Sequence, residues 1–242
     1  MHRLYLEAAL RAGVVGLDAQ ALRHVRALRL RAGDALLVFD GGGGQWQARL
    51  LASGEQVELL RFDDVEREPA SAVDIALGMP ANERMDWLVE KAVELGARSI
   101  APLMTARAVL KLDGERAERR RAHWRGVVIA ACEQCGRNRL PELHPVRSLR
   151  AWLQSLPPAG EAARCLLAPP SQPGALGLSS WVATLPAGQA VQVLSGPEGG
   201  LDAQEIEAAL EQGFVPVSLG PRTLRAETAP LALLAALSAW RG

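Results

Sequence analysis

The spacing of apolar residues changes near residue 70 and divides the chain into two parts. Before it, short and nearly alternating apolar segments at 35–39, 46–51 and 56–60 are separated by turn signals, among them the glycine run 41–44. Alternation with a period of two indicates strands with one buried face. We therefore expect residues 1–70 to form a small β-barrel or sandwich domain, with the glycine run at the tip of a hairpin and a linker near Pro69.

After residue 70, apolar runs of strand length alternate with helical periodicity. Met85, Leu88, Val89, Ala92 and Val93 recur at the spacing of one amphipathic helix. Such alternation predicts an α/β domain over residues 71–242, with a mostly parallel sheet covered on both faces. The proline-rich segment 157–189 is expected to form extended connections around its one strand. Strands are predicted at 73–79, 99–103, 164–168, 190–195 and 215–219, and further helices at 116–134, 202–213 and 226–240.

Composition narrows the class of protein. The 242 residues are 49% hydrophobic and 22% charged, which suits a folded chain with a substantial core. No apolar run reaches the roughly 18 residues that a membrane span needs, and no secretory leader pattern opens the sequence. We expect a cytoplasmic protein. Cys132, Cys135 and Cys165 are expected to be free thiols, and because the four histidines are scattered we expect no metal.

Charge is balanced overall but unevenly distributed. The formal net charge is zero, so a nucleic-acid partner must be argued from local clusters. Arginine presents a planar fork suited to phosphate, so two clusters are candidate RNA contacts, although a solvated helical face is the alternative interpretation of each. The first cluster is Arg23, His24, Arg26, Arg29 and Arg31, and the second is Arg107, Lys111, Arg116, Arg119, Arg120, Arg121 and Arg125.

The loops that follow three predicted strands are the first candidates for a ligand site. In open parallel sheets a ligand binds outside the carboxyl ends of the strands. The loops 167–170, 195–200 and 219–225 are rich in glycine and proline, which allow close backbone approach and fix bends. Neither a P-loop nor a dinucleotide fingerprint is present. We therefore favour a ligand that is bound by backbone groups, such as an adenosine moiety. The alternative is that these loops serve only as structural turns and a helix cap.

Several longer segments resemble one known family. The segment 194–201, LSGPEGGL, and the segment 213–229, GFVPVSLGPRTLRAETA, are similar to the C-terminal signature of the RsmE family. The helix 84–96, the segment 131–137 (ACEQCGR) and the segment 23–34 also resemble motifs of that family, so the likeness runs nearly end to end. Members are methyltransferases of the SPOUT class that use S-adenosylmethionine to methylate N3 of a uridine in 16S ribosomal RNA of the small subunit.

This resemblance implies a PUA-like RNA-binding β-barrel followed by a SPOUT domain with a deep C-terminal trefoil knot. It also implies S-adenosyl-L-methionine as cofactor, a homodimer, and 16S ribosomal RNA as partner, preferably in the assembled small subunit, with no membrane. The cofactor-binding residues that it implies are Leu167, Ala168, Pro169, Leu194, Ser195, Gly196, Pro197, Glu198, Gly199, Gly200, Leu219, Gly220, Arg222, Leu224 and Thr228.

The implied reaction asks for particular chemistry. Uridine N3 carries a proton at neutral pH, so the enzyme must help to remove it and stabilise the anion spread over the flanking carbonyl oxygens. Arg225 suits those oxygens, and Glu198 is the first choice of base and Glu227 the second, with roles as loop organiser or helix-start acid as alternatives. Orientation of the methyl group could itself supply most of the catalysis. The expected RNA contacts are Arg3, Arg23, His24, Arg26, Arg29, Arg137 and Arg139.

Other functions stay open. A ribose 2'-O-methyltransferase of the SpoU branch would keep the fold, but that branch usually carries Ser-Leu-Asn where this chain has Ser218-Leu219-Gly220. A PUA-like RNA-binding or assembly protein with a vestigial pocket is the alternative from another class. The intact pair of glycine loops argues against it. A nucleotide-dependent oxidoreductase is disfavoured because the dinucleotide fingerprint is missing.

Overall fold

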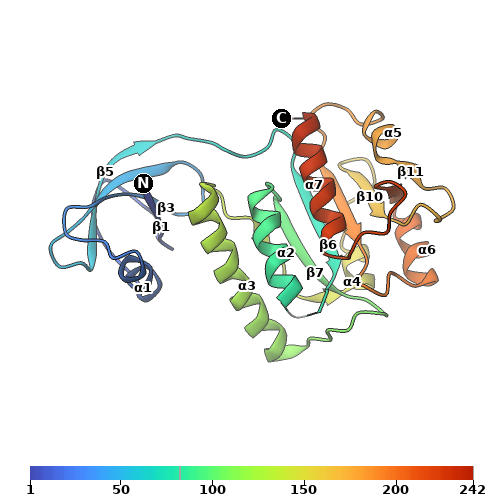
Figure 1. The fold of residues 1–242 in the computed structure, drawn as a ribbon, viewed down its shortest axis with the longest axis horizontal. Coiled ribbons are helices and arrows are strands. Elements are labelled where there is room, and N and C mark those ends of the chain that lie inside the picture. Colours follow the sequence, from blue (N-terminus) through green and yellow to red (C-terminus); the bar gives the residue numbers. More distant parts are fainter. Residues whose placement is uncertain (82, 242) are drawn as a thin grey trace. The chain divides into compact units, whose positions relative to one another are not determined.

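The computed structural model describes residues 1–81 and 83–241 and divides into two compact units. The first unit contains Met1–Glu68 together with Ile129–Leu140, and the second contains Pro69–Val128 together with the chain from Pro141 onward. One helix, α3 (Gly114–Cys135), starts in the second unit and ends in the first (Figure 1). No helix of the described part of the chain is both long enough and apolar enough to cross a bilayer.

The first unit is built on a five-stranded sheet of mixed direction. Its strands are β1 (His2–Tyr5), β2 (Gly13–Gly16), β3 (Ala35–Phe39), β4 (Gln45–Leu50) and β5 (Gln56–Asp63), in the order β1-β3-β4-β5-β2. Only the β1 and β3 pair is parallel; the others are antiparallel. The strands β3 and β4 pair across the glycine run, so the predicted hairpin is confirmed.

A short helix in the first unit, α1 (Ala19–Ala27), lies outside the predicted elements. The carboxylate of Asp18 caps it by accepting hydrogen bonds from the backbone N–H groups of Gln20 and Ala21, each at 2.8 Å. Its Ala21 and Val25 are buried in the same core as Leu36 and Val57 of the sheet. This core fixes the exposed arginines of α1 on the opposite side of the helix.

The second unit contains an eight-stranded sheet in which every pair is parallel, as predicted. The strand order is β11-β13-β10-β12-β6-β7-β8, and β9 also pairs with β7. The strands are β6 (Val73–Gly78), β7 (Ser99–Met104), β8 (Glu142–Leu143), β9 (Arg147–Ser148), β10 (Ala163–Leu167), β11 (Leu176–Gly177), β12 (Val191–Ser195) and β13 (Val215–Ser218).

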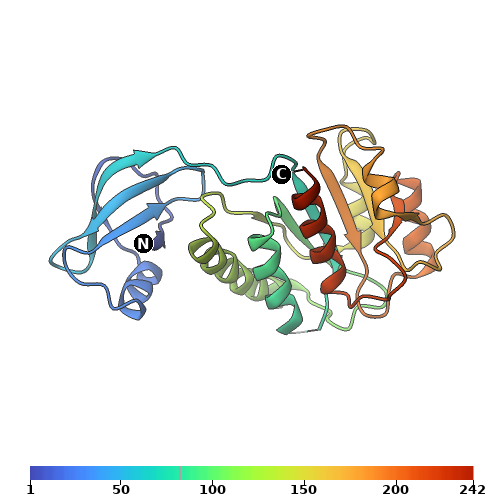
Figure 2. The same ribbon diagram turned by 45° about the horizontal axis from the view of Figure 1, so that its top comes forward.

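Helices cover both faces of this sheet (Figures 1 and 2). The helices α2 (Glu83–Glu94) and α7 (Thr228–Arg241) lie side by side over one face. On the other face, Trp152 and Leu153 of α4 (Leu149–Gln154) and Ala209 of α6 (Ala203–Glu211) join one buried cluster with sheet residues such as Leu103, Leu166 and Leu194. Because helices cover both faces, the strands are buried and only their ends are exposed.

The proline-rich segment is more structured than predicted. Besides its predicted strand it contains β11 and a short helix, α5 (Leu178–Val182). The expectation of extended connections was therefore wrong for this part. Trp181 and Val182 of α5 are buried, so apolar burial overrides the proline content of the segment.

Candidate functional site

A cavity of about 590 Å³ lies in the second unit at the carboxyl ends of three neighbouring parallel strands. Ligand pockets for small molecules commonly measure about 300 to 1,000 Å³. The strands β13, β10 and β12 are adjacent in the sheet, so the loops that follow them meet at one edge. Those three loops supply most of the cavity wall, which is where the sequence predicts a ligand.

Glu198 is a fixed anion at the wall of this cavity. Its Oε1 accepts hydrogen bonds from Arg84 Nη1 at 3.0 Å and from the backbone N–H of Ala81 at 3.1 Å. Burial acts to raise the pKa of Glu198, but the backbone hydrogen bonds and the Arg84 charge outweigh it and leave the pKa below its ordinary value. These contacts attach the loop after β12 to the start of α2, and they favour the role of loop organiser.

The helix that follows the same loop is fixed by reciprocal capping, as predicted. The Asp202 carboxylate accepts from the backbone N–H of Glu205 at 2.8 Å, and Glu205 Oε2 accepts from the N–H of Asp202 at 3.0 Å. The other oxygen of Glu205 accepts from the N–H of Ala106 at 2.8 Å. Because Arg107 also donates to the carbonyl of Gly199 at 3.1 Å, the loop after β7 holds this loop from a second side.

Close backbone packing around the cavity depends on glycine. A Cβ at Gly78, the last residue of β6, would lie 2.5 Å from Pro197 Cδ and 2.8 Å from Pro197 N. A Cβ at Gly196 would lie 3.0 Å from the backbone N of Leu201. The two glycines therefore let the loop after β12 pass close to its neighbours.

Three charged residues near the loop after β13 differ in their surroundings. Arg222 and Arg225 are exposed and line the cavity, and no hydrogen bond or ion pair of either guanidinium is found within the described part of the chain. Glu227 is only 6% exposed, and its Oε1 lies 3.8 Å from Arg84 Nε. Its buried Oε2 has no hydrogen-bond partner among the described residues. This loop therefore presents free cations to the cavity, whereas the carboxylate of Glu227 is buried away from it.

The structure brings most of the expected cofactor residues together. Leu194, Gly199 and Thr228 do not line the cavity, and neither does the expected base Glu227. Expected residues that line it are Leu167, Ala168, Pro169, Ser195, Gly196, Pro197, Glu198, Gly200, Leu219, Gly220, Arg222, Leu224 and Arg225.

Sequence reasoning missed two arginines of the cavity wall. Arg84 follows β6 and Arg107 follows β7, and both line the cavity. The strands β6 and β7 continue the sheet beyond β12, so their loops open at the same edge. The rule that selected the other loops would have found both residues if it had been applied to every predicted strand.

The expected RNA contacts fall into two groups in the first unit. Arg23, Arg26 and Arg29 are exposed, and their guanidinium groups make no hydrogen bond or ion pair within the described part of the chain. His24 is partly exposed, and its Nδ1 lies 3.2 Å from Glu133 Oε2. Burial raises the pKa of Glu133. The exposed arginines on and just after α1 are thus available to a ligand, and they stay predicted RNA contacts.

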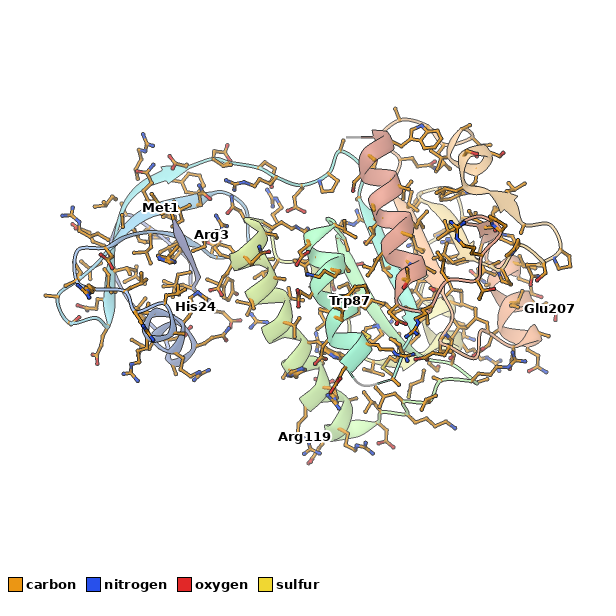
Figure 3. The ribbon with its side chains drawn as sticks, viewed as in Figure 1. Met1, Arg3, His24, Trp87, Arg119 and Glu207 are labelled. Carbon is orange, nitrogen blue, oxygen red and sulfur yellow. The ribbon has the colours of Figure 1, made fainter. Side chains whose placement is uncertain are left out.

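The guanidinium groups of the other three arginines are held by contacts within the first unit. Arg3 is buried, where it donates to Gln45 Oε1 at 2.7 Å and Asn138 Oδ1 at 2.6 Å (Figure 3). Burial lowers the pKa of Arg3. Arg137 is buried in an ion pair with Glu68, and Arg139 Nε donates to Glu66 Oε2 at 2.5 Å. These guanidinium groups already serve the fold, which makes them weaker candidates for RNA phosphate.

Family models and known proteins match nearly the whole chain. A model described as an RNA methyltransferase domain matches residues 66–238, and one described as an RNA methyltransferase PUA domain matches residues 17–60. Ribosomal RNA small subunit methyltransferase E of Bacillus subtilis is 34% identical over 220 residues, covering 88% of this chain and 85% of that protein.

Solved structures agree with this likeness. The protein of the same name from Neisseria gonorrhoeae, bound to S-adenosyl methionine, is 36% identical with a TM-score of 0.89, covering 99% of this chain and 98% of that one. A methyltransferase from Legionella pneumophila in complex with the same compound is 33% identical with a TM-score of 0.88, covering 98% and 97%. Both likenesses extend over the two units and the cavity.

Proposed function

Since the chain belongs to the ribosomal RNA small subunit methyltransferase E family, we propose that it transfers a methyl group from S-adenosylmethionine to N3 of a uridine in 16S ribosomal RNA. The observation that carries the proposal is the cavity of about 590 Å³ formed by three loops at one edge of the parallel sheet. The proposed domains are a PUA-like RNA-binding domain at 1–70 and a methyltransferase domain at 71–242 that contains the implied knot.

The residues around the cavity fit S-adenosylmethionine. Leu166, Leu167 and Leu219 offer apolar surface to an adenine ring, and the glycines at 196 and 200 leave backbone groups close to the ligand. The free guanidinium group of Arg222 suits a carboxylate. When bound, this cofactor supplies an electrophilic methyl group on a sulfonium.

Arg225 is the proposed catalytic residue. Loss of the uridine N3 proton leaves negative charge on two carbonyl oxygens, and an unpaired guanidinium at the cavity wall is suited to stabilise it. Of the two carboxylates, Glu198 has a lowered pKa and fixed partners, so it is the weaker base. Glu227 retains one oxygen without a hydrogen bond among the described residues, but it is buried and does not line the cavity, so neither carboxylate is assigned the proton. Orientation of the methyl group supplies the rest.

Arg84 should control the pH range in which the loop after β12 is ordered. In the wild type, the lowered pKa of Glu198 keeps its carboxylate ionised to a lower pH than that of an ordinary glutamate, so the stabilisation is full above the ordinary pKa and is lost as the pH falls through the lowered pKa. In Arg84→Gln we expect cofactor affinity to fall several-fold at pH 7, and its acid-side loss to begin at a higher pH. Calorimetric titration with S-adenosylmethionine from pH 4 to pH 7 measures both.

The control for this titration is Arg150→Gln, an exposed arginine of α4 remote from the loop in sequence. Its titration should coincide with that of the wild type. Coincidence of the Arg84→Gln and wild-type profiles would instead mean that the salt bridge to Glu198 does not hold the loop.

The exposed arginines on and after α1 are proposed to bind RNA phosphates. Reversing two of them, in Arg26→Glu/Arg29→Glu, should weaken RNA binding by more than tenfold and reduce its salt dependence, because each phosphate contact releases a counterion. Dissociation constants measured at several salt concentrations test this prediction. An unchanged slope of log Kd against log salt would remove these arginines from the RNA-binding surface.

We also propose a homodimer that acts on the assembled small subunit in the cytoplasm. Trp87 of α2 and Trp240 of α7 are 45% and 59% exposed on helices that share one face of the sheet (Figure 3 labels Trp87). Exposed indole rings are typical of protein interfaces. The cysteines are free, which suits a reducing compartment.

The test combines titration with S-adenosylmethionine and transfer of labelled methyl to small ribosomal subunits that lack the modification, followed by nucleoside analysis. Binding together with 3-methyluridine is the expected result. A 2'-O-methyl product would assign the chain to the ribose-methylating branch. Failure to bind the cofactor would contradict the proposal and leave an RNA-binding protein.

A further inference from the structure

The loop after β7 and the first half of α3 carry a local excess of positive charge. Residues 107–125 contain seven arginine or lysine side chains and three acidic ones, a formal charge of +4 in a chain whose formal net charge is zero. All of them belong to the second unit. The RNA contacts proposed above lie in the first unit, so that proposal leaves this charge unexplained.

Several of these cations are free to bind a ligand. Lys111 and Arg116 are exposed and Arg120 is partly exposed, and no hydrogen bond or ion pair of these side chains occurs among the residues the structure describes. Arg119 is 70% exposed, and its partner at 3.3 Å, Glu115, is 90% exposed, so the pair is readily exchanged for another anion. Figure 3 labels Arg119 on the N-terminal half of α3.

The three arginines share one side of the helix. Arg116, Arg119 and Arg120 are spaced at i, i+3 and i+4, which brings their side chains together on one helical face. Ala117 and Trp124 are buried about a quarter turn further round the helix, so Arg116 and Arg119 are directed away from the packed face and Arg120 lies at its margin. The helix therefore presents a row of guanidinium groups, preceded in the loop by Lys111.

These cations occupy the end of α3 where they stabilise the helix least. The N-terminus of a helix carries partial positive charge and favours acidic side chains, whereas cations belong near the C-terminus. In α3 the arginines begin at the third helical residue, and the last turn has no basic residue. The arrangement opposes helix stability but suits an anionic ligand, which the positive end of the helix dipole would also attract.

The same loop reaches the cavity. Arg107 lines the cavity and donates to the carbonyl of Gly199 at 3.1 Å, and Lys111 and α3 follow directly along the chain. We propose that Lys111, Arg116, Arg119 and Arg120 form a second RNA-binding surface, which holds the sugar-phosphate backbone beside the nucleotide that enters the cavity. This inference rests on the proposed function. This surface gives the methyltransferase domain RNA-binding residues of its own, separate from the arginines on α1.

The test compares Arg116→Gln/Arg120→Gln with Arg150→Glu, which changes the net charge by the same amount on α4. Binding is measured for protein-free small-subunit ribosomal RNA and for small subunits at several salt concentrations. The double variant should bind both about tenfold more weakly near physiological salt, with a slope of log Kd against log salt smaller by about 1.4 to 1.8. Its cofactor affinity should be unchanged, and its thermal midpoint equal or higher because glutamine relieves the helix N-terminus.

Each other outcome has a definite meaning. Affinity and slope equal to those of Arg150→Glu would overturn the proposal. A loss of affinity for assembled subunits alone would also overturn the proposal, because the surface would then bind an acidic protein and not RNA. Failure of the proposed function is distinguishable, because the wild type would then transfer no methyl group, while the salt-dependent binding of wild type and variant would still report on the surface.

Discussion

Arg225→Ala should lower kcat by about 10² to 10³, the usual cost of removing one group that stabilises a developing oxyanion. The guanidinium lines the cavity without a hydrogen bond or ion pair among the described residues, so its removal leaves no buried partner unsatisfied. Affinity for S-adenosylmethionine should change little, because the loops that form the cavity keep their own contacts. Single-turnover methyl transfer to small subunits, run beside calorimetric titration, separates the two effects.

Arg225→Lys provides the conservative comparison. Lysine keeps the charge but loses the planar fork, so it should restore part of the rate. Arg150→Ala, on the exposed side of α4, should behave as the wild type. Loss of cofactor binding in Arg225→Ala with normal turnover of the remaining complex would contradict the assigned role and make Arg225 a cofactor ligand.

Gly78→Ala should weaken cofactor binding at least tenfold and destabilise the fold by about 1 to 3 kcal/mol, as overpacking commonly does. The new Cβ would lie 2.8 Å from the backbone N of Pro197, a contact that a side-chain rotation cannot relieve. The loop after β12 must therefore move away from β6, and with it the wall that Glu198 helps to fix. Thermal unfolding and calorimetric titration measure the two effects.

Gly126→Ala is the matched control. Gly126 lies within α3, and beyond the neighbouring backbone of this helix a Cβ there would meet no atom of the described residues within 4 Å. Alanine is about 1 kcal/mol more favourable than glycine in a helix interior, so this variant should be slightly more stable and bind cofactor normally. Wild-type affinity in Gly78→Ala would mean that the cavity tolerates displacement of this loop.

The fold class could be predicted because its signals are local and repeated. The parallel sheet, the main helices and the cap at Asp202 each follow from periodicity or from residues close in sequence. The helix α1 escaped prediction because it spans only nine residues and buries few of them, although Asp18 stands at its start. Such a short arginine-rich segment resembles a loop in its polarity.

The roles of individual charged residues were harder to predict. Arg3 meets Gln45 and Asn138, which are 42 and 135 residues away in sequence, so neither its burial nor its partners can be deduced from neighbouring positions. Glu198 reads as a candidate base from its glycine loop, yet its partners Ala81 and Arg84 follow a different strand. The sequence shows which charged residues are candidates for binding or catalysis. Only the tertiary contacts show which of these side chains are not already engaged by other residues.

The discontinuous first unit limits how modular this chain can be. Arg3 depends on the carbonyl of Arg137 and on the side chain of Asn138, which belong to the segment after α3. A fragment cut at residue 70 would leave a buried guanidinium without these acceptors, which is costly. An exchange of the N-terminal domain between relatives must therefore transplant residues 129–140 along with residues 1–68, so that two separate stretches of the gene are inherited as a pair.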